Sequence, residues 1–308
     1  MNIVKTNGLI AAPFTPMHLD GSLALDRIPR YLQWLKHTGV GGAFVCGTTG
    51  EVASLSCDER REIARAWMQA APSGFSIIVH VGHTCLENCR GLAAHAQEIG
   101  AAAVSCFAPY FFRPRNTTEL ADWCAAVAAA APGLPFYYYH IPSMTGLNLP
   151  MADFMPLAAA KIPNFAGIKY TYEDLEDYAK CVRFAESRYD VLFGRDELLL
   201  SALQLGARGA VGSTYNFAAP LYRAIITAHE SGDLAAAKVG QTGAVAMIDS
   251  CVNAGGHPIA AFKSLMARLG VDCGPTRPPL ANPTSAQADA LRRRLHSLGC
   301  LPNHSSAT

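Results

Sequence analysis

Short apolar segments alternate with longer amphipathic segments along most of the chain. Eight of the apolar segments show almost no polar alternation, a pattern typical of parallel strands that are covered on both faces. The strands are expected at 8–14, 41–47, 75–81, 102–108, 134–141, 165–171, 190–194 and 209–213. The segments that separate them have the length and periodicity of helices.

Local signals mark the starts of two of these helices. Ser56 and Glu59 have the spacing of a capping box, in which each side chain binds a backbone N–H of the other residue. Thr84 and Glu87 have the same spacing, so a second capping box is expected there.

The succession of strand and helix predicts the fold class. Eight strand–helix units favour a closed α/β barrel, the (β/α)8 TIM barrel, over an open doubly wound sheet. No GxGxxG motif follows the first strand, which argues against a dinucleotide-binding fold. After residue 213 only helices are expected, at 221–240, about 240–252, 258–270 and 285–299. We predict a barrel over residues 1–230, a helical extension over 231–308 packed on it as one unit, and a frayed tail at 302–308.

Composition narrows the possible partners. Half of the 308 residues are apolar and 16% are charged, which excludes an intrinsically disordered chain. The formal net charge is +1 and no basic run is present, so nucleic acid and anionic membranes are poor candidates. No stretch approaches the roughly 20 apolar residues of a membrane span. Pro13 and Pro16 interrupt the first apolar run too early for a signal peptide. We expect a cytoplasmic protein that acts on a small molecule.

The cysteines and histidines do not predict a metal site. The ten cysteines are about 3% of the chain and lie mostly in apolar segments, so we interpret them as reduced core residues. The nearest approach to a ligand set is His80, His83, Cys85 and Cys89. This spacing matches no closed structural zinc site, and loop and helix-face positions are the simpler interpretation.

Lys169 is the strongest catalytic candidate. Active-site residues of barrels lie at the carboxyl ends of the strands, and Lys169 lies in the apolar strand segment GIKYT. The chain has seven lysines and eighteen arginines, so lysine is not its default cation. Burial lowers the pKa of an ammonium, and the neutral amine forms Schiff bases with carbonyls. An ion pair with a carboxylate, or a head group in solvent, remains the alternative.

Tyr139 ends the neighbouring strand in FYYYH. A phenol beside a Schiff-base lysine is suited to relaying protons. Strand alternation places Tyr137 and Tyr139 on one side and Tyr138 on the other. Aromatic filling of the barrel is the alternative interpretation.

Two turns and one acidic pair add candidate binding groups. The GTTGE turn offers backbone N–H groups and the hydroxyls of Thr48 and Thr49, which suit an anion such as a carboxylate. The GSTYN turn around Ser213 suits a phosphate or a sugar hydroxyl equally well. Asp196 and Glu197 are able to accept hydrogen bonds from a polyol, or they are the solvated start of a helix.

The motifs GTTGE, FYYYHIP, GIKYT, GRDE and GAVGSTYN occur together in a familiar order and spacing. From about residue 8 to about residue 280 the chain resembles the pyruvate-dependent class I aldolases, the family that contains N-acetylneuraminate lyase and dihydrodipicolinate synthase. The resemblance implies a Schiff-base lysine at Lys169, a proton-transfer tyrosine at Tyr139 and a pyruvyl carboxylate site at Thr48 and Thr49. It also implies that no cofactor or metal is needed, and that the protein is a homotetramer.

Within this family the chain is more similar to the lyase subgroup. The synthases carry an arginine where this chain has Met144, and a thioether cannot supply a bidentate cation. The lyases hold the glycerol tail of the sugar with an acidic pair, which Asp196 and Glu197 match. Further sugar contacts are matched by Thr171, Gly194 and Ser213.

The resemblance implies cleavage of N-acetylneuraminate into N-acetylmannosamine and pyruvate. One departure is Phe111, which stands where many members have a tyrosine that reaches a neighbouring subunit's site, with Tyr110 one residue earlier. A relay of three hydroxyls is therefore not assumed. Two alternatives stay open: another pyruvate-forming 2-keto-3-deoxy sugar acid aldolase or dehydratase, and a non-catalytic barrel that binds a sugar acid.

Overall fold

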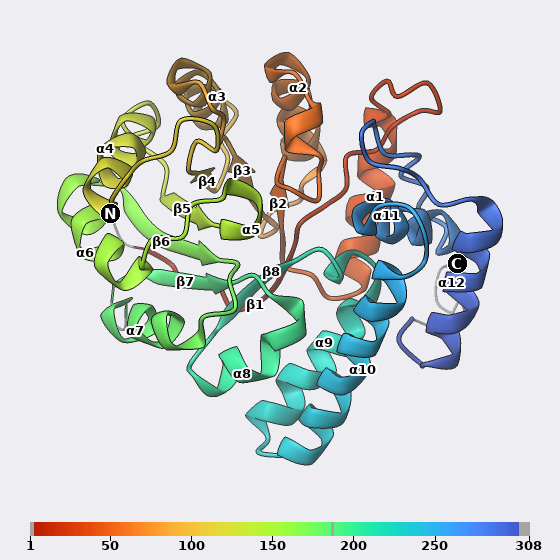
Figure 1. The fold of residues 1–308 in the computed structure, drawn as a ribbon. Coiled ribbons are helices and arrows are strands. Elements are labelled where there is room, and N and C mark those ends of the chain that lie inside the picture. Colours follow the sequence, from red (N-terminus) through yellow and green to blue (C-terminus); the bar gives the residue numbers. More distant parts are fainter. Residues whose placement is uncertain (1–2, 186–187, 302–308) are drawn as a thin grey trace.

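A closed barrel of eight parallel strands forms the centre of the molecule (Figure 1). The computed structural model describes residues 3–185 and 188–301, so the tail expected to fray at 302–308 lies outside the described residues. The strands are β1 (Gly8–Ala11), β2 (Gly42–Val45), β3 (Ser76–His80), β4 (Ala103–Phe107), β5 (Phe136–His140), β6 (Phe165–Tyr170), β7 (Asp190–Phe193) and β8 (Gly209–Gly212). Each lies within its expected segment, and the (β/α)8 prediction is confirmed.

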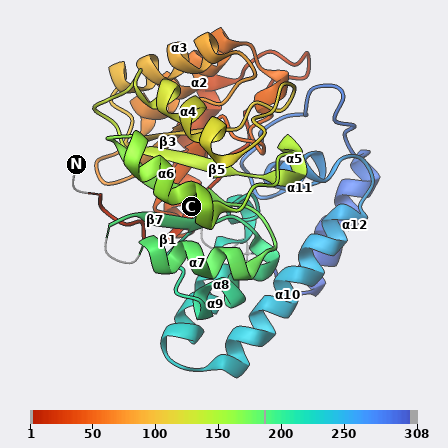
Figure 2. The same ribbon diagram turned by 60° about the vertical axis from the view of Figure 1, so that its left-hand side comes forward.

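Helices surround the barrel and continue beyond it. The barrel helices are α1 (Ile28–His37), α2 (Cys57–Ala70), α3 (Leu86–Glu98), α4 (Thr117–Ala128), α6 (Met151–Lys161), α7 (Leu175–Ala185), α8 (Leu199–Gln204) and α9 (Tyr215–Glu230). Short helices lie in the loops: η1 (Leu25–Arg27), η2 (Val52–Ser54), α5 (Pro142–Thr145) and η3 (Asp196–Leu198). The chain then forms α10 (Leu234–Val252), α11 (Pro258–Arg268) and α12 (Ser285–Ser297), which lie together on one side of the barrel in Figures 1 and 2. Among the described residues, no helix combines the length and apolar character that a membrane crossing requires.

One of the two predicted capping boxes is present. Ser56 caps α2, and Glu59 binds the backbone N–H of Ser56 in return. The box expected at Thr84 is wrong, because α3 has Cys85 as its N-cap and no side-chain cap. The ring of His83 accepts the N–H of Cys85 at 2.9 Å instead, so a local imidazole contact replaces the hydroxyl.

The helix expected over 221–240 is also wrong in its length. The chain leaves the helical path at Gly232, whose φ of 80° is left-handed. The carboxylate of Asp233 then accepts the N–H of Ala236 at 2.9 Å and starts a new helix. The segment expected at about 240–252 is the second part of α10. The predicted division of the chain at residue 230 falls between α9 and α10 and stays a prediction.

The strands have two apolar faces, as their continuous hydrophobic character predicts. One face packs against the helices and includes Tyr138. The other fills the barrel interior and includes Phe44, Tyr137 and Tyr139. The alternation predicted for the three tyrosines is confirmed.

An irregularity in β6 decides which way its side chains point. Tyr137 pairs with Gly167, whereas the residue before Tyr137 pairs with Phe165, so β6 contains one extra residue here. Such a bulge shifts the alternation of side chains by one position. Ala166 and Lys169 therefore both face the barrel interior, although they are three positions apart.

Gly167 allows this bulge because of its conformation and its neighbours. Its φ is 149°, a value that residues with a side chain rarely adopt. A Cβ at this position would lie 1.8 Å from the carbonyl oxygen of Asp190 in β7. Glycine is therefore required where β6 passes β7, two residues before Lys169.

The substitution Gly167→Ala should destabilise the barrel, because the added methyl group overlaps the backbone of β7. We expect the free energy of unfolding to fall by at least about 3 kcal/mol, measured by urea denaturation. Gly243→Ala in α10 is the matched control: a Cβ there meets no heavy atom within 4 Å. Alanine at that helical position should stabilise by up to about 1 kcal/mol. Equal stability of the two variants would contradict the role assigned to Gly167.

Candidate active site

A cavity of about 270 Å³ opens at the carboxyl ends of the barrel strands. This is the end at which barrels of this type carry their active sites. Its lining includes all nine residues that the sequence analysis assigns to the site: Thr48, Thr49, Tyr139, Lys169, Thr171, Gly194, Asp196, Glu197 and Ser213. The structure thus brings together side chains that follow or end β2, β5, β6, β7 and β8.

Lys169 extends from β6 into the barrel interior and is only 3% exposed. Its Nζ lies 3.9 Å from the ring centroid of Tyr139 and 4.1 Å from that of Phe44. Burial lowers the pKa of this amine to about 7, and the charge of Asp196 opposes the shift. Within the described residues the amine forms no ion pair, so the carboxylate partner left open by the sequence is not found there. A substantial fraction is therefore the neutral amine that attacks carbonyls at neutral pH.

The phenol of Tyr139 shares the cavity with this amine. Its hydroxyl lies 3.3 Å from Oγ1 of Thr48, and either oxygen is able to donate. Burial raises the pKa of Tyr139 to about 12, whereas the hydrogen bond with Thr48 lowers it. The phenol therefore stays protonated at neutral pH. It accepts a proton from another group only if it donates its own proton at the same time.

The turn after β2 supplies hydroxyl groups close to this phenol. Oγ1 of Thr49 lies 2.6 Å from Oγ of Ser213, so the turns after β2 and β8 are joined. Thr15 donates from its hydroxyl to the carbonyl of Gly50 at 2.7 Å and holds the turn from the side of β1. Hydroxyls and N–H groups held in this way are suited to binding a carboxylate.

Asp196 and Glu197 occupy different environments. Asp196 is buried, and its Oδ2 accepts the N–H of Thr214 at 3.1 Å and the hydroxyl at 2.6 Å. Burial raises the pKa of Asp196 to about 6. A Cβ at Gly212 would lie 2.1 Å from Asp196 Oδ1, so glycine makes room for the carboxylate. The carboxylate of Glu197 is half-buried and lies 3.8 Å from the guanidinium of Arg195. The interpretation as the solvated start of a helix therefore fits Glu197 better than Asp196.

Gly194 makes similar room for Thr171. A Cβ at Gly194 would lie 2.0 Å from Oγ1 of Thr171. The hydroxyl of Thr171 therefore takes the space that a larger residue after β7 would fill, at the wall of the cavity.

The helical extension contributes a wall that the sequence analysis did not assign to the site. Side chains of α10 and α11 close one side of the cavity: Ile248, Val252, Ile259 and Phe262. Gln241 of α10 also donates to the backbone carbonyls of Asp196 (3.1 Å) and Glu197 (2.8 Å). No local sequence signal separates such residues from ordinary core positions, because their periodicity is the same.

The loop after β4 stays away from the cavity. Tyr110 and Phe111 are 38% and 75% exposed, and neither belongs to the cavity lining found in the described part of the chain. Met144 does line the cavity.

The residues considered for metal binding make other contacts. The backbone N–H of His83 donates to Sγ of Cys89 at 3.1 Å. His80 is buried against the ring of Phe107, and burial lowers its pKa well below the ordinary value. Across residues 3–185 and 188–301, no group of three or more His, Cys, Asp or Glu is arranged to hold a metal ion.

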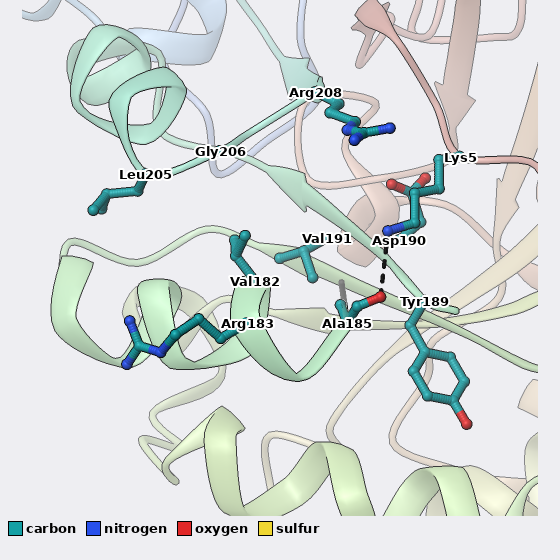
Figure 3. Close-up of a pocket in the computed structure, with 10 residues that line it drawn as sticks. All are labelled: Lys5, Val182, Arg183, Ala185, Tyr189, Asp190, Val191, Leu205, Gly206 and Arg208. Carbon is teal, nitrogen blue, oxygen red and sulfur yellow. Dashed lines mark hydrogen bonds between the residues drawn. The ribbon is translucent and has the colours of Figure 1, made fainter. Parts of the chain in front are cut away.

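A second cavity, of about 330 Å³, lies near the amino ends of the strands (Figure 3). Lys5, Asp190 and Arg208 are among the residues that line it. Lys5 donates to the carbonyl of Ala185 at 3.3 Å, and Asp190 accepts the N–H of Thr6 at 3.0 Å. Lys5 and Asp190 thus bind the chain itself, whereas the cavity around Lys169 lies at the carboxyl ends of the strands and is the candidate active site.

Relatives of known activity resemble the chain over nearly its whole length. A family model described as the dihydrodipicolinate synthetase family matches residues 5–298. The N-acetylneuraminate lyase of Rattus norvegicus is 40% identical over 301 residues, which are 96% of this chain and 94% of the relative. The lyase of the same name from Danio rerio is 38% identical over 96% of this chain and 97% of the relative.

Solved structures agree with these sequence relatives. The N-acetylneuraminate lyase of Proteus mirabilis superposes with a TM-score of 0.93 at 37% identity, over 97% of this chain and 100% of the other. That of Aliivibrio salmonicida has a TM-score of 0.93 at 38% identity, over 97% of this chain and 99% of the other. With a family model that spans most of its length and relatives at this level of identity, the chain belongs to the dihydrodipicolinate synthetase family.

Proposed function

We propose that this chain is a Schiff-base (class I) aldolase, a carbon–carbon lyase that cleaves N-acetylneuraminate into N-acetylmannosamine and pyruvate. The observation that carries the proposal is the buried amine of Lys169, whose pKa falls to about 7 in a cavity shared with a phenol. The similarity to N-acetylneuraminate lyases supports the choice of substrate. The iminium that Lys169 forms with the substrate serves as the electron sink, so the reaction needs no metal or organic cofactor.

The first step joins the substrate to the enzyme. The turn of Thr48 and Thr49 holds the carboxylate of the open-chain sugar acid, which places its C2 ketone close to the amine. The neutral Nζ of Lys169 attacks C2, and loss of water gives an iminium ion. The positive iminium then acts as the electron sink for the next step.

The second step breaks the bond between C3 and C4. The C4 hydroxyl loses its proton while the bonding electrons move into the iminium, which becomes an enamine of pyruvate. Tyr139 takes this proton as it gives its own to the substrate carboxylate, since its raised pKa keeps the phenol protonated at rest. N-acetylmannosamine leaves as the aldehyde. The proton then returns from the carboxyl group through Tyr139 to C3 of the enamine, and hydrolysis of the imine releases pyruvate and restores the amine.

The remaining cavity residues bind the sugar. Asp196 and Glu197 accept hydrogen bonds from the hydroxyls of the glycerol tail, because carboxylates are strong acceptors and both residues line the cavity. Other polar or small residues of the cavity line the path of the sugar: Thr171, Gly194 and Ser213.

Assembly as a homotetramer and a cytoplasmic location are parts of the same proposal. The family resemblance supports the tetramer. Phe111 and Phe112 are 75% and 85% exposed in the single chain, and neighbouring exposed aromatics are typical of contact surfaces. Size-exclusion chromatography with light scattering tests the assembly, and a monomer would contradict it.

Borohydride added with pyruvate should trap a covalent adduct on Lys169, because hydride reduces the imine to a stable amine. Peptide mass spectrometry locates the added mass. Lys169→Arg should abolish the adduct and lower kcat by at least about 10³-fold, since a guanidinium does not become a neutral nucleophile. Lys161→Arg, a change at a surface lysine paired with Asp122, should leave the adduct intact. No adduct, or an adduct on another residue, would overturn the mechanism.

The rate of imine formation with pyruvate should rise with pH through a midpoint near 7, and not near the 10.5 of an ordinary lysine. Burial favours the neutral amine, so the nucleophilic fraction grows over this lower range. Asp196→Asn should move the midpoint further down, because the carboxylate favours the charged ammonium. Single-turnover trapping on either side of pH 7 measures both midpoints. An upward shift in the variant would contradict this electrostatic assignment.

Asp196→Asn should also raise KM for N-acetylneuraminate by about tenfold or more, because a charged acceptor for the sugar tail is lost. KM for a shorter 2-keto-3-deoxy acid that lacks the tail should change little. Pyruvate release, followed with a coupled assay, measures both. Equal changes in KM for the two substrates would contradict the assignment of Asp196 to the tail site. Faster cleavage of the shorter acid by the unmodified chain would favour the alternative, a 2-keto-3-deoxy sugar acid aldolase.

A further inference from the structure

Glu51, the last residue of the GTTGE motif, has no part in the chemistry described above, yet the structure holds it in an unusual state. Its φ of 62° and ψ of 37° are left-handed, which is unfavourable for a residue with a side chain. Its carboxylate is 0% exposed. A buried charge on a strained backbone persists only where the surroundings determine it.

Those surroundings come from the other end of the chain. Oε1 of Glu51 accepts a hydrogen bond from Nζ of Lys263 at 2.9 Å, and Oε2 accepts the backbone N–H of Arg277 at 2.8 Å. The side chain of Lys263 is 1% exposed and also donates to the carbonyl of Pro275 at 2.6 Å. The buried carboxylate is therefore bound on both oxygens, and its charge is balanced by a buried ammonium.

The ion pair lies between two parts of the site. On one side, the N–H of Glu51 donates to the carbonyl of Thr48 at 3.0 Å, and Thr49 is two residues away. On the other side, Lys263 follows Phe262 in α11, and Phe262 lines the cavity. The turn assigned to the substrate carboxylate is thus fixed to the helical extension by a contact that water does not reach.

We propose that Glu51 and Lys263 are positioning residues, whose ion pair holds the Thr48–Thr49 turn in the conformation that binds the carboxylate of the keto acid. The inference rests on the proposed function. Neither residue belongs to the lining of the cavity in the described chain, so both act through the turn and not through contact with substrate. On this basis the helical extension supports binding of the substrate carboxylate and also closes one wall of the cavity.

A carboxylate-specific measurement separates this role from a merely structural one. Acetone carries the same ketone as pyruvate without the carboxylate, so imine formation with acetone depends on Lys169 but not on the turn. In Glu51→Gln, which keeps the size of the side chain and removes its charge, the pyruvate concentration for half-maximal borohydride trapping should rise about tenfold or more. The corresponding acetone concentration should stay unchanged. Lys263→Gln should give the same split from the opposite side of the pair.

Asp289→Asn is the matched control, because it weakens the Arg268–Asp289 ion pair (2.8 Å) inside the extension and does not touch the turn. It should leave the values for both ketones unchanged. Equal rises for pyruvate and acetone in folded Glu51→Gln would overturn the inference, and so would no rise for pyruvate. Absence of any adduct in the unmodified chain would instead overturn the proposed function, on which the inference rests.

Circular dichroism shows whether each variant folds, and a second route covers the case in which the single variants do not. The double variant Glu51→Gln/Lys263→Gln removes both buried charges together, so no unpaired charge remains. It should show the same split between pyruvate and acetone.

In the unmodified chain, saturating pyruvate should slow hydrogen exchange at Glu51 and Arg277 together, since the N–H of Arg277 binds the carboxylate of Glu51. Protection of the turn alone would contradict the coupling.

Discussion

The uncharged state of one buried amine is the constraint on which the rest of the site depends. Lys169 lies against the rings of Phe44 and Tyr139, and its pKa falls from 10.5 to about 7, so protonation is about 5 kcal/mol less favourable there than in water. The same burial opposes folding at neutral pH, because the unfolded chain binds a proton that the folded chain partly lacks. The contribution of this group to stability therefore rises as the pH increases from 7 to 10.5. The apolar core of the barrel has to offset this penalty.

The direction of that amine is decided by backbone register. With regular alternation, a strand that turns Ala166 into the barrel would also turn Ile168 inward and would place Lys169 among the helices. The extra residue at Gly167 reverses this order, and only glycine fits there because β7 passes so close. A feature of the strand that carries no functional group is thus required for the lysine to reach the cavity.

Local pattern was enough to predict the barrel and to place Lys169, Tyr139 and the GTTGE turn together at its carboxyl ends. Thr171 and Gly194 were expected only from the family resemblance. Buried parallel strands leave continuous apolar runs, and parallel pairing brings their ends together, so residues far apart in sequence meet without any pairwise signal. The capping box expected at Thr84 and the continuous helix expected across Gly232 were wrong, because short-range contacts of neighbouring side chains decide where these helices begin. The contributions of Gln241 and Phe262 were missed for another reason. Where an amphipathic helix docks depends on the whole fold, and its sequence gives only the face that is buried.

Asp196 has to meet two opposing requirements in this cavity. A carboxylate near the amine stabilises the ammonium and so lowers the fraction of neutral nucleophile, yet the proposed sugar site uses this carboxylate as an acceptor for the tail. The position of the carboxylate meets both requirements. Thr214 binds one oxygen of Asp196, and Gly212 leaves space for the carboxylate, so that it forms no direct ion pair with Lys169 among the described residues. With its pKa raised to about 6, Asp196 is still mostly ionised at neutral pH, where the amine is already partly neutral. Burial raises the pKa of the carboxylate and lowers that of the amine, so both values lie near neutrality. At pH 7 and above, the cavity presents a charged acceptor together with a growing fraction of neutral nucleophile.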